Sequence, residues 1–512
     1  MTAFLAIVKL TIRSAVRSHI FRLLLILLLL SVFLLPFTLM GDGTPKGDVQ
    51  IFLQYCLGFA GFILCLSSVW LACSEVSSDV ETAQIHMIVV KPVHRAVVLL
   101  GKYTGVVLIH LFLLLIAATA FYAFLSLRIA SYETKKESIK ERITDSSLTE
   151  SERERLYKEY SKLEDSLVML NEQVLTARAL YSPVRPDFSA LAQQELDRRI
   201  KDAQEHGQNV SQYQDDQTRQ EAFLAIRKEL IATYGLTTEG ESVFWQFEGL
   251  PKDLTDDDVV FLRYTVYVNR YYTQDQNSVR GHWIFAANYV RQDDLGGETV
   301  VSDLMALPEE DILTSAQNEM AVPIRNSYFI YDGKAEVGFL NKDRNTSELN
   351  FEEGKGPFLL IREAGFFSNY CRAILVLAIG ILSVTLLASA VAACMSLPIA
   401  IFFSAAYMLV GGLANYLVTS IPDALDYQAE YTGTFGYQFG NILLKMIVPL
   451  QDFFVTGHLA NGELVSFRFI GELFLWNFSD NTPGVLLRVL PVFLLGAWIY
   501  TRRELALVSK RG

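Results

Sequence analysis

The chain has 512 residues, of which 51% are hydrophobic, and its formal net charge is −12. The apolar residues are concentrated in residues 1–128 and 366–501, while the stretch between them has the composition of a soluble protein. This distribution excludes a purely soluble chain and predicts a membrane region interrupted by a large polar insertion. The acidic balance of the insertion argues against nucleic acid as a partner.

The N-terminal residues 1–22 carry four basic side chains and no acid. Lys9, Arg13 and Arg17 share one helical face and apolar residues occupy much of the remainder, which predicts an amphipathic helix on the inner membrane surface. The alternative is that this segment simply extends the first membrane helix.

Six segments approach the roughly 20 apolar residues that a membrane-spanning helix requires. They are residues 20–40, 51–73, 97–127, 371–395, 397–421 and 484–500. The expected membrane domain is therefore α-helical, with three spans within residues 20–128 and three within 366–512. The first span is longer than the apolar core of a signal peptide, so we expect no cleavage there.

Basic residues in the short flanking segments set the expected orientation. The N-terminus, the segment containing Lys91, Arg95 and Lys102, and the C-terminus are all basic and should all be cytoplasmic, which six spans permit. We therefore expect a bacterial inner-membrane protein with both termini in the cytoplasm and residues 129–365 outside it.

The first part of the insertion, residues 129–241, has helical periodicity. A helix is expected to begin at a capping box made by Thr149 and Glu152, to carry a heptad seam, and to end at Ser182-Pro183. Further helices are expected at residues 135–143 and 220–234. The seam indicates a helical hairpin or coiled coil, formed within the chain or with another copy. Its members are Leu156, Tyr160, Leu163, Leu167, Leu170, Val174 and Ala177.

The second part, residues 242–365, alternates with period two over residues 260–268. Shorter strands are expected at 282–290, 327–331 and 336–340, and together they predict a β-sandwich. Such sandwiches often bind glycans through exposed aromatic rings. For the aromatic residues of this segment, however, we favour the interpretation that they fill the core of the sandwich over the interpretation that they bind a glycan. The candidate ligand-facing aromatics are Trp245, Tyr271, Tyr272 and Trp283.

Enzyme motifs are missing from the sequence. It contains no G-x-x-x-x-G-K-[ST], H-E-x-x-H, C-x-x-C or G-x-S-x-G pattern, so we expect no catalytic, cofactor-binding or metal-binding residues. All five cysteines lie in or beside apolar segments, which excludes a disulfide framework in the insertion. His110 is the main ionisable residue within the apolar segments, which disfavours an ion-coupled pump.

The segment between the second and third spans, residues 74–96, is the most informative. A short amphipathic helix is expected from 78 to 90, followed by a break at Pro92 and a basic cluster. Because it joins two membrane helices directly, a force applied to it would move both. The alternative is a passive basic flank that only sets topology.

At these residues the sequence resembles the permease subunits of ABC-2 type transporters. In that family an acidic residue opens the loop, and a Lys-Pro-Val-Ser-Arg-like element leads to Gly-Lys at the next helix. His94 replaces the Ser, and Ala83-Gln84 replaces the family's Gly-Thr step. The matching residues are Asp79, Lys91, Pro92, Arg95, Gly101 and Lys102.

The resemblance extends over roughly residues 1–130 and 370–512. It includes the N-terminal amphipathic helix, the turn at 396–398, an outer re-entrant segment at about 437–480 and the closing residues 500–505. The insertion is much larger than in typical members of the family.

The resemblance implies a half-transporter without catalytic residues of its own. Two membrane subunits, a second copy or a paralogue, would pair, and two separate ATPase subunits holding ATP and Mg would dock on the inner loops. The residues implied at this coupling site are Asp79, Glu81, Lys91, Pro92, Arg95 and Lys102.

Three functions remain open at this point. The first is export or extraction of a lipid, glycan or peptide. The second is mechanotransmission, in which ATP-driven motion acts on an envelope protein and nothing crosses the membrane. The third is a membrane-anchored glycan-binding scaffold that has no ATPase.

Overall fold

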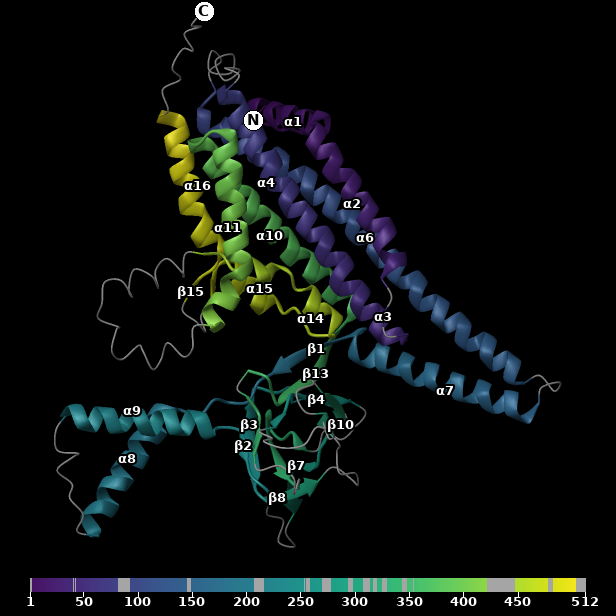
Figure 1. The fold of residues 1–512 in the computed structure, drawn as a ribbon, viewed down its shortest axis with the longest axis vertical. Coiled ribbons are helices and arrows are strands. Elements are labelled where there is room, and N and C mark those ends of the chain that lie inside the picture. Colours follow the sequence, from purple (N-terminus) through teal and green to yellow (C-terminus); the bar gives the residue numbers. More distant parts are fainter. Residues whose placement is uncertain are drawn as a thin grey trace, which may run out of the picture. The chain divides into compact units, whose positions relative to one another are not determined.

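The computed structural model separates the chain into two compact units (Figure 1). Unit 1 comprises Met1–Ala177 and Ala364–Gly512, and unit 2 comprises Arg178–Glu363. The structure describes residues 2–39, 41, 43–81, 93–144, 149–206, 216–252, 254, 258–268, 278–292, 298–306, 314–315, 320–324, 329–342, 348–352, 354–420, 447–477 and 482–502.

Unit 1 is predominantly helical (Figure 1). Its N-terminal helices are α1 (Thr2–Arg17), α2 (His19–Thr38), α3 (Pro45–Ile51), a π-helical turn (Phe52–Leu57), α4 (Gly58–Glu81), α6 (Arg95–Ile143) and α7 (Glu150–Gln173). Its C-terminal elements are α10 (Phe366–Cys394), α11 (Leu397–Ser420), the 3-10 helix η4 (Leu450–Phe453), α14 (Thr456–Ala460), α15 (Phe467–Phe474), the short strands β14 (Trp476–Asn477) and β15 (Thr482–Pro483), and α16 (Val485–Arg502).

Five helical stretches in the described part of the chain are long and apolar enough to cross a membrane. They are His19–Thr38, Pro45–Ser77, Arg95–Ile143, Phe366–Cys394 and Val485–Arg502, and a shorter apolar stretch covers Leu397–Leu413 within α11. Large apolar side chains such as Leu23, Phe37 and Phe402 are exposed on their surfaces, where lipid would cover them. The chain is therefore a helical membrane protein.

The helices of unit 1 define two ends of the bundle. We call the end that holds α1, Glu81, Arg95 and Arg502 the termini end. The opposite end, where α6 leaves the bundle and α10 enters it, is the insertion end. Both names describe the protein alone and assign neither end to a side of the membrane.

The N-terminal segment forms a helix of its own. Ser18 has extended backbone angles between α1 and α2, and its hydroxyl accepts a hydrogen bond from the Phe21 amide at 3.5 Å. α1 therefore ends at Arg17 and turns away from the axis of α2 (Figure 1). The alternative of one continuous first helix is wrong.

The heptad seam pairs within the chain. α6 runs unbroken through residues 135–143, and Ile139 and Ile143 belong to the same buried cluster as Leu163 and Leu170 of α7. The Lys136 ammonium reaches the Glu164 carboxylate at 2.7 Å, and this contact lowers the pKa of Glu164. The last turns of α6 therefore form a helical hairpin with α7.

The predicted end of the seam is wrong. α7 ends at Gln173 rather than at Ser182-Pro183, and residues 176–181 form strand β1 (Thr176–Tyr181). β1 lies beside β13 (Phe358–Gly365) in a sheet. Ala177 keeps the heptad spacing of the seam, but pairing with a neighbouring strand determines its structure instead.

Unit 2 contains two four-stranded sheets, ordered β1-β13-β4-β10 and β3-β11-β7-β8, and smaller sheets. Side chains from both four-stranded sheets form one apolar cluster. Of the expected strand at 327–331, residues 329–331 are described and show a single bridge, Tyr331 with Lys334, while 327 and 328 lie outside the described residues. The other elements are α8 (Phe188–Glu205), α9 (Asp216–Thr233), β2 (Leu236–Thr237), β3 (Ser242–Glu248), β4 (Val260–Tyr264), β5 (Tyr267–Val268), β6 (Ser278–Val279), β7 (Gly281–Gln292), β8 (Glu298–Ala306), β9 (Thr314–Ser315), β10 (Met320–Ile324), β11 (Lys334–Asn341) and β12 (Leu349–Asn350).

Candidate functional site

The termini end is where the expected coupling segment begins and ends. α4 runs to Glu81 and α6 starts at Arg95, so the connection between them joins two helix ends at the termini end. Asp79 and Glu81 belong to the last turn of α4. Lys91 and Pro92 lie outside the described residues, as does most of the expected helix at 78–90.

Lys102 ties α6 to α4 at this end. Its side chain is 5% exposed, and its ammonium group donates a hydrogen bond to the backbone carbonyl of Glu75, a residue that is itself 9% exposed. A buried ammonium needs hydrogen-bond acceptors because desolvation disfavours its charge. Lys102 is therefore a positioning residue within the bundle.

Arg95 ties α6 to the last membrane helix. Its guanidinium donates to the Thr501 carbonyl oxygen at 3.3 Å, in the final turn of α16. His94 caps α6 by accepting a hydrogen bond from the Ala96 amide at 3.3 Å, which fixes where the helix begins. The first turn of α6 is thus held against α16 by Arg95.

Polar side chains from two helices reach the backbone of α10. The Ser77 hydroxyl on α4 donates to the Ala392 carbonyl at 3.4 Å, and the Tyr103 hydroxyl on α6 donates to the Leu382 carbonyl at 3.4 Å. Ala388 and Ala392 are fully buried, and such small residues let helix backbones approach closely. The termini ends of α4, α6 and α10 therefore form one packed block.

His110 lies inside this bundle, between α4 and α6. It is fully buried; its Nε2 is 3.1 Å from the Ser67 hydroxyl, and its Nδ1 is 2.8 Å from the Val106 carbonyl. Both ring nitrogens thus have partners, as expected of an interhelical tie. In the portion of the chain that the structure describes, no group of three or more His, Cys, Asp or Glu residues forms a metal site.

An irregular segment, residues 447–457, packs among α10, α11 and α16, and it includes the short helix η4 and the first residues of α14. The Arg488 guanidinium donates to the Ile447 carbonyl at 2.6 Å, and the Tyr407 hydroxyl accepts from the Val448 amide at 2.9 Å. Backbone that is not helical is tolerated at membrane depth only where the protein satisfies its polar groups. Arg488 therefore has a hydrogen-bond partner within the bundle.

Two glycines make room for this segment. A Cβ on Gly411 of α11 would lie 2.7 Å from the Val448 carbonyl oxygen, and one on Gly380 of α10 would lie 2.9 Å from the Phe453 side chain. At 1.5 Å per residue, Gly380 is about 21 Å from the end of α10 at Cys394. Phe453 thus reaches well into the bundle. Of the expected re-entrant region at about 437–480, residues 447–477 fall within the described chain.

The insertion end is braced by ionic contacts around α3. The Asp48 carboxylate pairs with Arg128 of α6 at 3.5 Å and also accepts a hydrogen bond from Tyr132. Lys46 of α3 donates to Gln173 at the end of α7. α3 is therefore attached to both helices of the α6–α7 hairpin at its base.

The candidate ligand-facing aromatics are not on the surface. Trp283 is fully buried and Trp245 is 2% exposed, and their rings pack 6.0 Å apart with Phe351 and Tyr264 against Trp283. These tryptophans fill the core between the sheets, which confirms the favoured interpretation for both and contradicts the alternative that they face a ligand. Tyr271 and Tyr272 lie outside the described residues.

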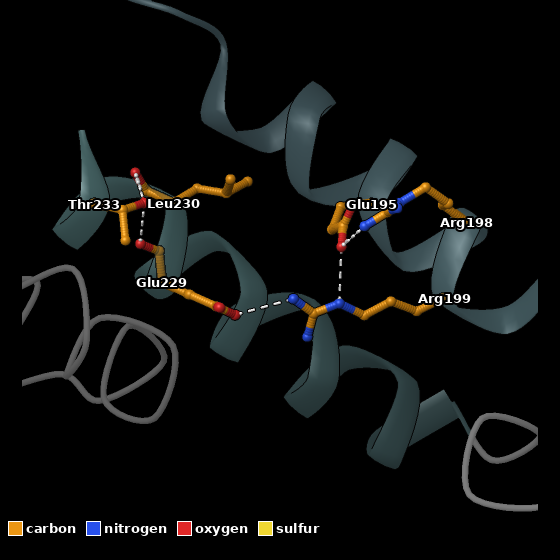
Figure 2. Close-up of polar contacts among 6 residues, drawn as sticks. All are labelled: Glu195, Arg198, Arg199, Glu229, Leu230 and Thr233. Carbon is orange, nitrogen blue, oxygen red and sulfur yellow. Dashed lines mark hydrogen bonds and ion pairs between the residues drawn. The ribbon is translucent and has the colours of Figure 1, made fainter. Parts of the chain in front are cut away.

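An ion-pair cluster holds α8 against α9 in unit 2, and it was not predicted because no helix was expected at residues 188–205. Arg199 donates to Glu195 at 2.9 Å and to Glu229 of α9 at 3.1 Å, while Arg198 also donates to Glu195 (Figure 2). These guanidinium groups lower the pKa of Glu195 to about 2. The signal for α8 was Asp187 after Pro186, because Asp187 caps the Ser189 and Ala190 amides.

Comparison with known proteins finds no matching family model, no significantly similar characterised protein and no significantly similar solved structure.

Proposed function

We propose that this chain is the permease subunit of an ATP-driven ABC transporter of the ABC-2 type. In this proposal α11 is a sixth span, the termini end lies in the cytoplasm of a bacterium, and unit 2 lies outside. Two permease copies, or this chain and a paralogue, pair and are driven by two separate ATPase subunits that bind ATP and Mg.

The observation that carries the proposal is the attachment of both ends of the 82–92 connection to the rest of the bundle. Lys102 fastens α6 to α4 near Glu75, and Arg95 fastens α6 to α16. A partner that displaces this connection would move α4, α6 and α16 together, as an ATPase-driven membrane subunit requires. The chain itself would carry no catalysis.

The expected cargo is a lipid, glycan or peptide that is exported or extracted from the membrane. The segment 447–457, held within the bundle by Arg488 and Tyr407, supports this proposal, since the family places a re-entrant segment before its last span. A wide polar cavity between paired copies would favour transport.

A second candidate, mechanotransmission without transport, is favoured by the length of α6. This one helix of 49 residues runs from Arg95 at the termini end to Ile143 in the hairpin with α7. At 1.5 Å per residue it is about 74 Å long. Motion applied to its first turn would reach an envelope protein at the hairpin without passage of any substrate. A glycan-binding scaffold has less support, because Trp245 and Trp283 are buried.

The first test is purification from the native host in mild detergent. We expect a stoichiometric ATPase to co-purify and to be lost from the double variant Glu81→Ala and Lys91→Ala. The control is Lys201→Ala with Glu205→Ala, an exposed pair on α8 that removes the same two charges. A chain that purifies alone, with unchanged envelope function in the Glu81/Lys91 variant, would overturn the proposal.

A second test separates transport from mechanotransmission. Two glycines inserted after Ser131 interrupt α6 beyond the expected span at residues 97–127 and should leave ATPase binding intact. Loss of envelope function with retained substrate export would assign the function to the hairpin. Unchanged envelope function would exclude mechanotransmission through α6.

A further inference from the structure

We propose that α1 is a binding surface for anionic phospholipid headgroups, held on the bundle by α6. The proposal depends on α1 lying at a membrane and is independent of any ATPase partner. It follows from the way the side chains of this 16-residue helix divide into three faces.

The first face fixes α1 on α6. Val8, Thr11 and Ala15 are buried, and a Cβ on Gly105 of α6 would lie 2.8 Å from the Thr11 side chain. A Cβ on Gly101, one turn earlier on α6, would lie 2.8 Å from the Ile7 side chain. Outside this contact, α1 has exposed side chains on two further faces.

The second face is apolar and exposed. Leu5 is 60% exposed and Val16 is 56% exposed, with the half-buried Ile12 between them. At 100° per residue these three residues lie within about 40° of one another around the helix. Such a stripe beside the spanning helix α2 is suited to the acyl chains just below the headgroups.

The third face is a row of cations next to that stripe. Lys9, Arg13 and Arg17 are all exposed, and residues 1–22 contain no acid. Across the described residues, no carboxylate pairs with any of these three side chains. An apolar stripe bordered by unpaired cations matches a membrane surface that carries negative headgroups, and each cation near such a surface contributes about fivefold in affinity at low salt.

The test places the full-length protein in nanodiscs made of phosphatidylcholine alone or of equal phosphatidylcholine and phosphatidylglycerol. Hydrogen exchange is then measured on the peptide covering residues 2–17. We expect exchange to be several-fold slower in the anionic discs, and this difference to shrink at high salt. The triple variant Lys9→Gln, Arg13→Gln and Arg17→Gln should lose the difference and exchange as wild type does in phosphatidylcholine.

The control variant Lys140→Gln, Arg142→Gln and Arg155→Gln removes three exposed cations from the α6–α7 hairpin and should keep the lipid difference. Inorganic phosphate added to phosphatidylcholine discs should not slow exchange; if it does, α1 binds anions in general rather than lipid. Equal exchange of wild type in both discs, or a lipid difference that survives in the Lys9/Arg13/Arg17 variant, would overturn the proposal.

Discussion

The ammonium group of Lys102 on α6 donates to the backbone carbonyl of Glu75 on α4, and both residues are buried at the termini end of the bundle. This contact joins the two helices whose ends enclose residues 82–92. It also explains why a basic residue occurs inside an apolar helix, where an unpaired ammonium would be costly.

Replacing Lys102 with Met tests this contact. The substitution keeps most of the side-chain length but removes the donor, and a hydrogen bond from a charged group contributes about 1.5–3 kcal/mol. We expect the detergent-solubilised protein to unfold a few degrees lower than wild type. Lys162→Met, at an exposed position on α7, is the control and should leave the unfolding temperature unchanged. Equal effects of the two substitutions would contradict a specific role for the contact.

Two neighbouring glycines test the packing of residues 447–457. A Cβ on Gly411 would meet the Val448 carbonyl at 2.7 Å, whereas one on Gly412 meets nothing within 4 Å. We expect Gly411→Ala to destabilise the protein by about 1–3 kcal/mol through overpacking. Gly412→Ala should be neutral or slightly stabilising, because Ala favours a helix by about 1 kcal/mol over Gly. Thermal unfolding of both variants decides the matter, and a destabilised Gly412→Ala would mean that the segment lies elsewhere.

The hairpin predicts a contrast between two positions on α7. Leu170 is fully buried in the same apolar cluster as Ile139 and Ile143 of α6, while Val168 is 47% exposed. Leu170→Ala should cost about 2–5 kcal/mol by leaving a cavity. Val168→Ala should cost less than about 0.5 kcal/mol. Limited proteolysis of residues 129–173 measures the difference, and similar cleavage of both variants would be inconsistent with an intramolecular seam.

The ion pairs of Glu195 predict acid sensitivity of the α8–α9 hairpin. Its pKa lies near 2 in the folded protein, below the ordinary value of 4.5, so its contribution to stability is present above about pH 4.5 and is lost as the pH falls toward 2. Hydrogen exchange of the peptide 188–205, corrected for the intrinsic pH dependence, should rise over this window. Glu195→Gln should exchange faster already at pH 7 and lose most of the pH response. Glu205→Gln, whose nearest cation is 3.9 Å away, should retain it.

Periodicity along the chain accounts for much of what could be predicted. Residues 371–395 are almost uniformly apolar and correspond closely to α10 (Phe366–Cys394). Leu163 and Leu170 fall on a heptad and are buried as a seam requires. Such patterns are local, because helix geometry alone places residues three and four apart on one face.

Contacts between distant segments could not be predicted in this way. Ala177 continues the heptad spacing but belongs to a strand, because residues 358–365 pair beside it. The helix that packs against the heptad seam could not be predicted either, since a heptad specifies an apolar stripe and not the chain that covers it. In the structure, the last turns of α6 cover the seam.

The sequence by itself determined that this is a helical membrane protein with a large polar insertion, because apolar length and charge placement are properties of the chain. Only the tertiary structure decided that Lys102 and Arg488 bind backbone carbonyls inside the bundle and that Trp245 and Trp283 are core residues. The reason is physical: whether a polar or aromatic side chain faces solvent, lipid or protein depends on which remote segment packs over it.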